Sequence, residues 1–227
     1  MATISLCMIV KNESAVLARC LDSIADLMDE IIIVDTGSTD NTKEIAAQYT
    51  SRIYDFKWAS DFSAARNFSF SKATMEYIYT ADADEILDDA NRERFLRLKG
   101  ALLPEIEIVQ MKYVTQGTFD TVLNAKKEYR PKLFRRLRTF TWIDPIHETV
   151  RLTPVTFDSD VEILHCPQSL HSKRDFSIFI KAFEHDGQFS PKIRTMYAKE
   201  LLKTGDKKDF TDAKPIFQLI FDNDPAD

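Results

Sequence analysis

The chain has 227 residues, of which 44% are hydrophobic and 29% charged, a balance typical of a globular protein with one domain and a small appendage. Its net charge of −6 argues against a broad basic face, so we expect no nucleic-acid partner. The five glycines lie too far apart to build a GxGxxG or GxxxxGKS/T loop, which excludes both of these phosphate-binding devices.

The cysteines and the apolar segments predict a cytoplasmic protein without a membrane span. Cys7, Cys20 and Cys166 form no CxxC pair, and an odd number of cysteines fits a reducing compartment. The apolar run at residues 4–10 is short and no charged segment precedes it, so it does not resemble a signal peptide. No segment approaches the roughly 20 apolar residues that cross a bilayer.

The first hundred residues alternate between strand and helix patterns. Apolar runs predict buried strands at residues 4–10 and 31–34, and two further strands are predicted at residues 52–56 and 77–80. Apolar residues spaced three and four apart predict helices between them, at residues 16–28, 41–49 and 61–73. Asn41 and Glu44 have the spacing of a capping box for the second helix. The series predicts an α/β fold with a mostly parallel sheet covered by helices.

The second half of the chain has a different texture. A helix pattern near residues 88–98 is followed by longer strands with mixed faces, at residues 106–115, 129–136 and 161–165. From His171 onward only helical spacing continues. We therefore expect one domain at residues 1–167, with halves at residues 1–100 and 101–167. A helical extension is expected at residues 168–227. Because the chain stops directly after a helix pattern, we expect the natural protein to continue beyond Asp227.

Polar residues follow three of the predicted strands at their carboxyl ends, where open α/β sheets bind ligands. These segments are residues 11–13, 35–40 and 82–85. Loops that serve only as solvent-exposed turns would not be expected to concentrate polar residues at the ends of three strands. We therefore expect a substrate to contact Asn12, Glu13, Asp35 and Asp82.

Two of these segments have both a functional and a structural interpretation. The Asp35 carboxylate could accept hydrogen bonds from a base or a ribose, or it could cap the next helix while Gly37 makes the turn. Asp82 and Asp84 could divide the contacts to a sugar hydroxyl and a metal, since Mg²⁺ and Mn²⁺ favour one or two carboxylates plus phosphate oxygens. They could instead form a solvated turn that opens a helix at Ile86.

Two groups of cations suggest contacts to an anionic substrate. Arg66 lies on the second turn of a helix that we expect Ser60 or Asp61 to cap, where its guanidinium could reach a diphosphate or form a surface salt bridge. Arg130 belongs to a predicted strand with four cations up to Arg136, whose alternate members share a face. The same charges could instead protect the edge of a sheet.

Residues late in the domain provide candidates for acid–base and metal chemistry. Glu148 follows His147 in a stiff, proline-containing loop, where a carboxylate could act as a general base. His165 ends the last predicted strand, and a neutral imidazole is a common metal ligand. His165, Cys166 and His171 match no zinc-binding spacing, so we do not expect a zinc site.

Six blocks in this order resemble the family-2 glycosyltransferases, in the branch that includes lipopolysaccharide-core transferases and transferases that modify peptides. The resemblance covers about residues 3–166, through the blocks SLCMIVKNE (5–13), VDTGSTDNT (34–42), DFSxxRN (61–67), ADADE (81–85), RPxLFR (130–135) and PIHE (145–148). No block is specific alone, whereas their common order is specific.

The resemblance implies a GT-A fold, meaning a Rossmann-like mixed sheet with helices on both faces. It also implies a nucleotide-sugar donor, with UDP favoured, Mn²⁺ or Mg²⁺ as the cofactor, and inversion at the anomeric carbon. Within the site, it implies that Asp35 binds the nucleoside and that Asp82 lies near the ribose and the donor sugar. Asp84 would bind the metal, and His165 corresponds to a histidine that some of these enzymes place on metal or diphosphate.

The resemblance leaves the base and the acceptor open. Glu148 falls where the catalytic carboxylate of the family is expected, with His147 beside it. The usual motif has an acidic residue followed by Asp, so Asp144 stays a second candidate for the base. The acceptor could be a glycan, a lipid-linked molecule or a peptide.

Two other interpretations remain open. The strand before Asp82 and the DxD spacing superficially resemble the haloacid-dehalogenase phosphotransferases, in which the first Asp is the nucleophile. The segment 191–225 instead looks like part of a tetratricopeptide-type helix pair, which needs neighbours to bury its apolar face. A non-catalytic interaction protein, or a homodimer formed through the helical tail, would use that face.

Overall fold

The computed structural model describes residues 1–115, 127–136, 142–143, 145–147, 149–150, 155–166 and 172–223. The chain divides into two compact units. The first comprises Met1–Trp58, Ala65–Trp142 and Val150–Gln168, and the second comprises Ala59–Ala64, Ile143–Thr149 and Ser169–Asp227. The second unit thus includes two short segments from within residues 1–167 as well as the C-terminal helices. The expected domain boundary at residue 167 stays a prediction.

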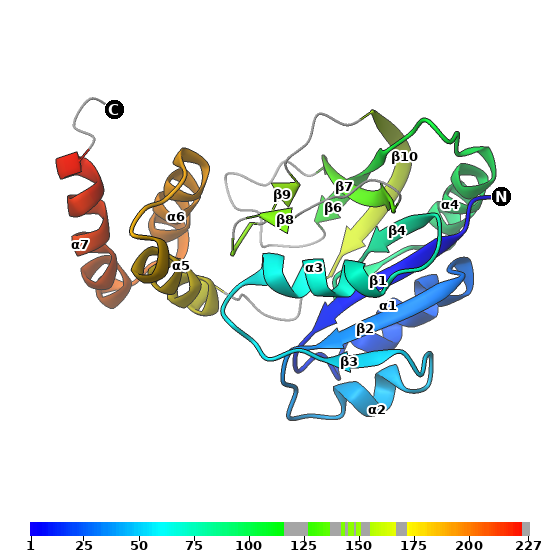
Figure 1. Cartoon of the computed structure of the whole chain (residues 1–227), viewed down its shortest axis with the longest axis horizontal. Helices are drawn as coiled ribbons and strands as arrows, with labels where there is room; N and C mark the ends of the chain where they lie inside the picture. Colours follow the sequence, from blue (N-terminus) through cyan, green and yellow to red (C-terminus); the bar gives the residue numbers. More distant parts are fainter. Residues whose placement is uncertain are drawn as a thin grey trace. The chain divides into compact units, whose positions relative to one another are not determined.

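The first unit is built on an eight-stranded mixed sheet with the order β3-β2-β1-β4-β7-β6-β10-β5 (Figure 1). Neighbours are parallel from β3 to β4 and between β6 and β10, and antiparallel on both sides of β7 and between β10 and β5. The strands are β1 (Ile4–Val10), β2 (Glu30–Asp35), β3 (Ile53–Asp55), β4 (Tyr77–Thr80), β5 (Glu85–Ile86), β6 (Ile108–Thr115), β7 (Lys127–Arg135) and β10 (Thr156–His165). A separate two-stranded sheet consists of β8 (Trp142–Ile143) and β9 (Thr149–Val150).

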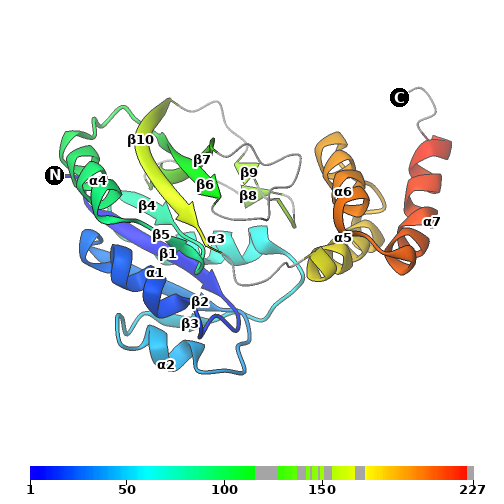
Figure 2. The same ribbon diagram turned by 180° about the vertical axis from the view of Figure 1, so that it is seen from behind.

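Helices lie on both faces of the large sheet. They are α1 (Leu17–Ile24), the short 3₁₀ turn η1 (Ala25–Leu27), α2 (Thr42–Ala46), α3 (Phe62–Lys72) and α4 (Asp89–Ala101). In Figures 1 and 2, α1 and α4 cover one face and α3 covers the opposite face. The alternation predicted for the first hundred residues is therefore confirmed, with element ends shifted by a few residues.

Strand β1 shows why the sheet needs cover on both sides. Leu6 and Met8 pack in one apolar cluster with α1 and with Phe95 of α4, whereas Cys7 packs in a second cluster with Phe70 of α3. Leu6, Cys7 and Met8 are at most 1% exposed. A strand buried on both faces has a continuous apolar sequence, which is why the pattern identified it.

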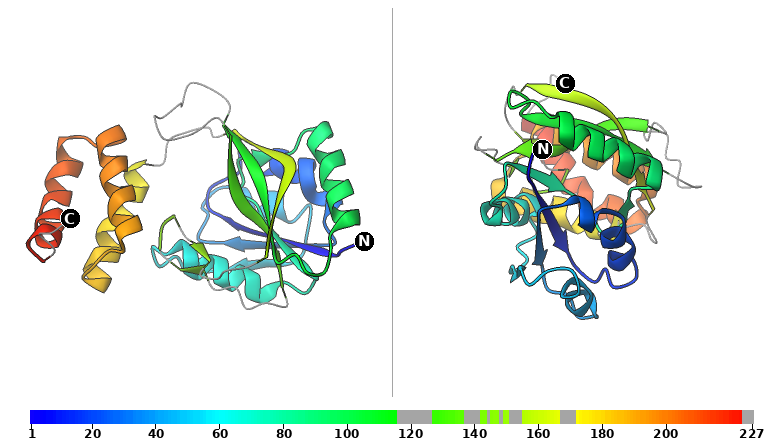
Figure 3. Two further views of the ribbon diagram at one scale, coloured as in Figure 1. Left: turned by 90° about the horizontal axis from the view of Figure 1, so that it is seen from above. Right: turned by 90° about the vertical axis from the view of Figure 1, so that its right-hand side faces the viewer.

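Strand β7 lies inside the sheet and not at its edge. Both of its neighbours, β4 and β6, run antiparallel to it. In Figure 3, the strands β6, β7 and β10 cross the direction of β1 and β2, as expected of a strongly twisted sheet. The pairing with β4 covers residues 133–135, so this part of β7 is not a sheet edge; Arg130 pairs with Met111 of β6, and its interpretation as edge protection stays open.

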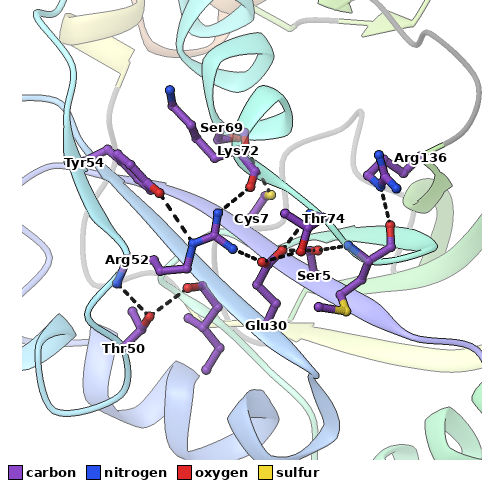
Figure 4. Close-up of polar contacts among 12 residues, drawn as sticks. Ser5, Cys7, Glu30, Thr50, Arg52, Tyr54, Ser69, Lys72, Thr74 and Arg136 are labelled. Carbon is purple, nitrogen blue, oxygen red and sulfur yellow. Dashed lines mark hydrogen bonds and ion pairs between the residues drawn. The ribbon is translucent and has the colours of Figure 1, made fainter.

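A network of hydrogen bonds and an ion pair connects polar side chains around the first residue of β2 (Figure 4). Oε2 of Glu30 accepts hydrogen bonds from the Ser5 hydroxyl at 2.5 Å and from the Thr74 backbone N–H at 2.9 Å. Oε1 accepts the Thr74 hydroxyl at 2.8 Å and forms an ion pair with Arg52, which also donates to the Lys72 carbonyl at 2.7 Å. The Glu30 side chain is 6% exposed, and both of its oxygens have partners.

The described part of the second unit contains the helices α5 (Ser172–Asp186), α6 (Pro191–Thr204) and α7 (Lys207–Asn223). Tyr197 of α6 is fully buried among them. Its ring stacks on Phe179 of α5 at a centroid distance of 4.5 Å and lies 5.3 Å from Phe217 of α7. The helical C-terminal segment expected from the sequence is therefore present. Neither these helices nor those of the first unit, as far as the structure describes them, are long and apolar enough to cross a bilayer.

Candidate functional site

Asp35 is the last residue of β2. It lies at the carboxyl end of the parallel strands, where it pairs with Val10 at the end of β1. Asp35 is 2% exposed. Its Oδ1 accepts hydrogen bonds from the backbone N–H groups of Gly37 and Ser38, both at 2.9 Å. Its Oδ2 is buried and has no hydrogen-bonding partner among the described residues. The turn thus accounts for one oxygen, and the other is a candidate acceptor for a bound molecule.

Hydrogen bonds join the loop after β1 to the loop after β2. The Asn12 side chain accepts a hydrogen bond from the Thr39 N–H at 2.7 Å, and the Asn12 N–H donates to the Ser38 hydroxyl at 2.9 Å. Asn12 has a φ of 55°, a left-handed conformation that Asn tolerates better than most residues. The Glu13 N–H donates to the Thr42 hydroxyl at 2.8 Å. Asn12 and Glu13 therefore hold the loop that follows β2, and their contact with a substrate stays a prediction.

Asp40 completes this link between the loops. Its Oδ1 accepts the Thr42 N–H at 3.1 Å, and its Oδ2 accepts the Ser14 N–H at 3.2 Å. Burial acts to raise the pKa of Asp40, but the hydrogen bonds from Ser14 and Thr42 outweigh it and lower the pKa to about 2. The predicted capping box is wrong, because the side chain of Asn41 makes no capping hydrogen bond and Asp40 supplies the acceptor instead.

Just after β4, Asp82 lies beside basic residues. Its Oδ1 is 3.6 Å from Nη2 of Arg66, which projects from α3 and is only 8% exposed. Partial burial acts to raise the pKa of Asp82, but the charges of Lys132 and Arg66 outweigh it and hold the pKa below its usual value. The Asp82 side chain is 47% exposed. Asp82 is therefore an ionised and accessible acceptor beside a guanidinium.

Glu85 and Lys132 form a buried ion pair that supports this turn. Nζ of Lys132, on β7, donates to Oε1 of Glu85 at 2.5 Å, and the two side chains are 7% and 2% exposed. Oε2 of Glu85 accepts the Asp82 backbone N–H at 3.2 Å. Burial raises the pKa of Glu85 in spite of the charge on Lys132. Their pairing could not be predicted from the sequence, because only the position of β7 beside β4 brings Lys132 to the ADADE block.

The structure brings the two predicted metal ligands together. Strand β10 ends at His165, which pairs with Glu85 of β5, and this pairing sets Asp84 beside the imidazole. Nε2 of His165 lies 3.0 Å from Oδ2 of Asp84, and the side chains are 24% and 19% exposed. The alternative in which these acids open a helix at Ile86 is wrong, because Glu85–Ile86 forms a strand and α4 begins only at Asp89.

Arg130 and Tyr113 lie beside this pair. The guanidinium carbon of Arg130 is 3.6 Å from the centroid of the Tyr113 ring, which in turn is 5.0 Å from the ring of His165. Arg130 also forms an ion pair with Glu128. Its positive charge contributes to the lowered pKa of Asp82. This cation of the predicted site therefore lies close to the acidic residues.

The predicted base belongs to a different part of the chain. Glu148 and Asp144 lie outside the described residues. His147 belongs to the second unit and has a φ of 50°. Its carbonyl accepts a hydrogen bond from Nζ of Lys192 at 2.8 Å, and its ring lies 6.0 Å from that of Phe179. The catalytic roles of these residues stay predictions.

The described candidate site thus lies in the first unit. Its members follow strands at the carboxyl edge or project toward those residues: Asp35, Arg66, Asp82, Asp84, Arg130 and His165. Within the described ranges, no three or more His, Cys, Asp or Glu side chains are grouped so that they could hold a metal by themselves. A metal bound at this edge would therefore need ligands from a bound molecule or water.

Comparison with known families distinguishes between the interpretations of this site. Residues 5–153 match the family described as Glycosyl transferase family 2. The chain belongs to this family. The match includes Asp35, Asp82 and Asp84, and it does not favour the phosphotransferase or the non-catalytic interpretation.

Two relatives resemble parts of the chain. A TPR repeat-containing protein of Synechococcus elongatus is 49% identical over 87 residues, which are 38% of this chain and 22% of that protein. The SPbeta prophage-derived glycosyltransferase SunS of Bacillus subtilis is 33% identical over 132 residues, which are 56% of this chain and 31% of that protein. The chain therefore matches less than a third of the length of either relative.

The fold is shared with glucosyl-3-phosphoglycerate synthase from Mycobacterium tuberculosis. The two structures have a TM-score of 0.58 and 19% sequence identity, with 84% of this chain and 82% of that chain covered. That crystal structure is a complex with Mn²⁺, UDP-glucose and phosphoglyceric acid. At this identity the likeness concerns the fold alone, and it confirms the expected GT-A type of α/β fold.

Proposed function

We propose that the chain carries an inverting glycosyltransferase activity that moves a sugar from a nucleotide-sugar, with UDP as the favoured carrier, to a glycan, lipid-linked or peptide acceptor. One observation supports the proposal above all. In a member of Glycosyl transferase family 2, the unpartnered oxygen of Asp35, the Arg66–Asp82 pair and the Asp84–His165 pair lie at strand ends where α/β sheets bind ligands.

Three side chains would hold the donor. The unpartnered Oδ2 of Asp35 would accept an N–H or O–H of the nucleoside. Asp82, ionised at neutral pH, would accept a hydroxyl of the ribose or of the sugar. Arg66 would hold oxygens of the diphosphate, for which the planar guanidinium is suited because it donates two parallel hydrogen bonds.

Asp84 and His165 fit a site for Mn²⁺ or Mg²⁺. Their facing donor atoms are 3.0 Å apart. Two adjacent ligands of an octahedral ion with bonds of about 2.1 Å are also about 3 Å apart. Diphosphate oxygens and waters would supply the remaining ligands. When bound there, such a cation would neutralise the charge that develops on the leaving diphosphate.

Glu148 is the proposed base, with His147 beside it and Asp144 as the alternative. The nucleophile of the acceptor would attack the anomeric carbon from the side opposite the diphosphate, so that its bond forms while the bond to the diphosphate oxygen breaks and the configuration inverts. The carboxylate would take the proton from the attacking group. Such proton transfer typically contributes a factor of about 10²–10⁴ to the rate.

Thermal unfolding with UDP, GDP and dTDP, each with and without Mn²⁺, tests the donor site. A nucleotide present at a hundred times its Kd stabilises the native state by about 2.7 kcal/mol, which raises the Tm by about 5–11 °C for a chain of this size. We expect UDP to do so only with Mn²⁺ and Asp84→Ala to remove the metal-dependent part. Transfer from a UDP-sugar is expected to fall about 10³-fold in Asp84→Ala and in Glu148→Gln.

Asp186→Ala is the matched control, because Asp186 also pairs with a histidine, His185, at 2.6 Å, but on the exposed surface of α5. It should leave both nucleotide binding and transfer unchanged. The proposal fails if no nucleotide stabilises the protein, or if Asp84→Ala behaves like Asp186→Ala.

A further inference from the structure

Trp142 lies against Arg66 in the first unit. The guanidinium carbon of Arg66 is 4.8 Å from the centroid of the indole, a distance at which a cation is attracted to an aromatic face. The indole also contacts Phe70 and Phe134, at centroid distances of 5.8 and 5.4 Å and interplanar angles of 86° and 64°. Trp142 is 8% exposed. Its ring is therefore held in one orientation by the apolar cluster.

Asn67, the residue after Arg66 on α3, fixes the backbone of Trp142. Its Oδ1 accepts the Trp142 N–H at 2.8 Å, and its Nδ2 donates to the Trp142 carbonyl at 3.0 Å. The two bonds resemble the exchange between paired residues of a β-sheet, although one side chain makes both. Arg66 and Asn67 are adjacent on α3. The same turn of this helix therefore carries the guanidinium of Arg66 and fixes the tryptophan residue on whose ring that guanidinium lies.

The choice of tryptophan at this position is informative. The indole N–H is buried and has no hydrogen-bonding partner in the described part of the chain. A buried unpaired donor is unfavourable, and phenylalanine would fill an apolar position without it. What an indole offers beyond a phenyl ring is a stronger attraction for a cation on its face. The presence of tryptophan at position 142 therefore points to a role for the face of the indole ring on which Arg66 lies.

We propose that Trp142 is a positioning residue of the donor site, whose ring holds the guanidinium of Arg66 beside Asp82 for the diphosphate of the donor. The guanidinium lies 3.6 Å from Asp82, and the indole face on which it rests further limits the orientations that it can adopt. A side chain that is ordered before binding loses less conformational entropy when the ligand arrives. This inference rests on the proposed function, because it requires Arg66 to contact the donor.

A double-mutant cycle tests whether Trp142 acts through Arg66. Titration calorimetry measures the Kd of UDP with Mn²⁺ for the unmodified chain, Trp142→Phe, Trp142→Leu, Arg66→Ala and the double variant Arg66→Ala/Trp142→Leu. We expect UDP to bind about threefold more weakly to Trp142→Phe and about tenfold more weakly to Trp142→Leu. In the Arg66→Ala background, Trp142→Leu should have no further effect on the Kd.

Phe68→Leu is the matched control for these variants. Phe68 lies on the same helix, and Lys72 places its Nζ 4.5 Å from the Phe68 ring, so the substitution also removes a contact between a cation and an aromatic face. It should change the Tm and leave the Kd of UDP within about twofold, because Lys72 is not part of the proposed site.

Two results would overturn the positioning role. The first is an equal weakening by Trp142→Leu with and without Arg66, which would mean that the ring acts through the fold. The second is an unchanged Kd in a folded Trp142→Leu chain. Absence of UDP binding by the unmodified chain is a different result, because it overturns the proposed function and with it the donor role of Arg66.

Discussion

Strand β2 carries a buried carboxylate at each end, and the two differ in how their oxygens are paired. At its first residue, Glu30 has partners on both oxygens, including Arg52 (Figure 4). At its last residue, Asp35 has two backbone partners on Oδ1 and, among the described residues, none on Oδ2. Burial alone therefore does not distinguish the two acids, whereas the pairing of each oxygen atom does.

This comparison separates a structural acid from a candidate binding acid. A buried network in which every polar atom is paired stabilises one arrangement of the chain, whereas a half-paired carboxylate is unfavourable until a ligand supplies the missing donor. By the same criterion, Glu85 is a structural acid like Glu30, although it is next to Asp84, a candidate metal ligand. Its two oxygens are occupied by Lys132 and by the Asp82 N–H.

The largest expected effect on stability is that of Glu30→Ala. The substitution removes the acceptor shared by Ser5, Thr74 and Arg52, so we expect the free energy of unfolding to fall by about 3 kcal/mol and the Tm by about 6–12 °C. Glu44→Ala on α2 is the matched control, because Glu44 is exposed, and it should stay within about 0.5 kcal/mol. If both variants unfold at the same urea concentration, the network around Glu30 does not stabilise the sheet.

Asp35→Asn is expected to show the opposite behaviour. Its amide keeps an oxygen for the N–H groups of Gly37 and Ser38 but replaces the unpartnered carboxylate oxygen with a donor. We expect the Kd of UDP to rise about 10- to 100-fold, the value of a hydrogen bond to a charged group, while the Tm stays within about 2 °C. Calorimetry and thermal unfolding measure the two quantities. A lower Tm with an unchanged Kd would make Asp35 a structural acid like Glu30.

The smallest expected effect is that of Asp40→Asn, and it depends on pH. The pKa of Asp40 in the folded chain is about 2, below the ordinary value of 3.8, so its charge stabilises the fold above about pH 4 and this contribution is lost as the pH falls from 4 to 2. We expect the variant to lose about 1 kcal/mol at pH 7, as for a helix cap. Urea unfolding should show this difference shrinking below pH 4, and a difference independent of pH would contradict the role of the charge.

The sequence was most informative where burial leaves a continuous pattern. The apolar runs of β1, β2 and β4 predicted strands because both faces of each are covered. Asp35, the last residue of β2, and Asp82, just after β4, were therefore assigned to the correct edge of the sheet. The start of α3 was also predicted, since Asp61 accepts the Ala64 N–H at 3.1 Å as a helix cap does.

Contacts that depend on the order of the strands could not be predicted in this way. Strand β5 has two residues, too few for any periodicity, yet its pairing with β10 brings His165 to Asp84. Likewise, no local pattern indicates that β7 lies beside β4, which is what lets Lys132 reach Glu85. The packing of Trp142 on Arg66 likewise joins residues that lie far apart in the sequence, and no local pattern indicates it.

Strand β7 is the last neighbour of β4 to be synthesised. While the chain grows, β4 can pair with β1 at once, but its other side has no partner strand until Lys127–Arg135 has been made. Through that interval the backbone N–H and C=O groups along one side of Tyr77–Thr80 form an open edge, to which a strand of another chain can add. This edge of β4 therefore stays open to misassembly until Lys127–Arg135 has been made and has paired with it.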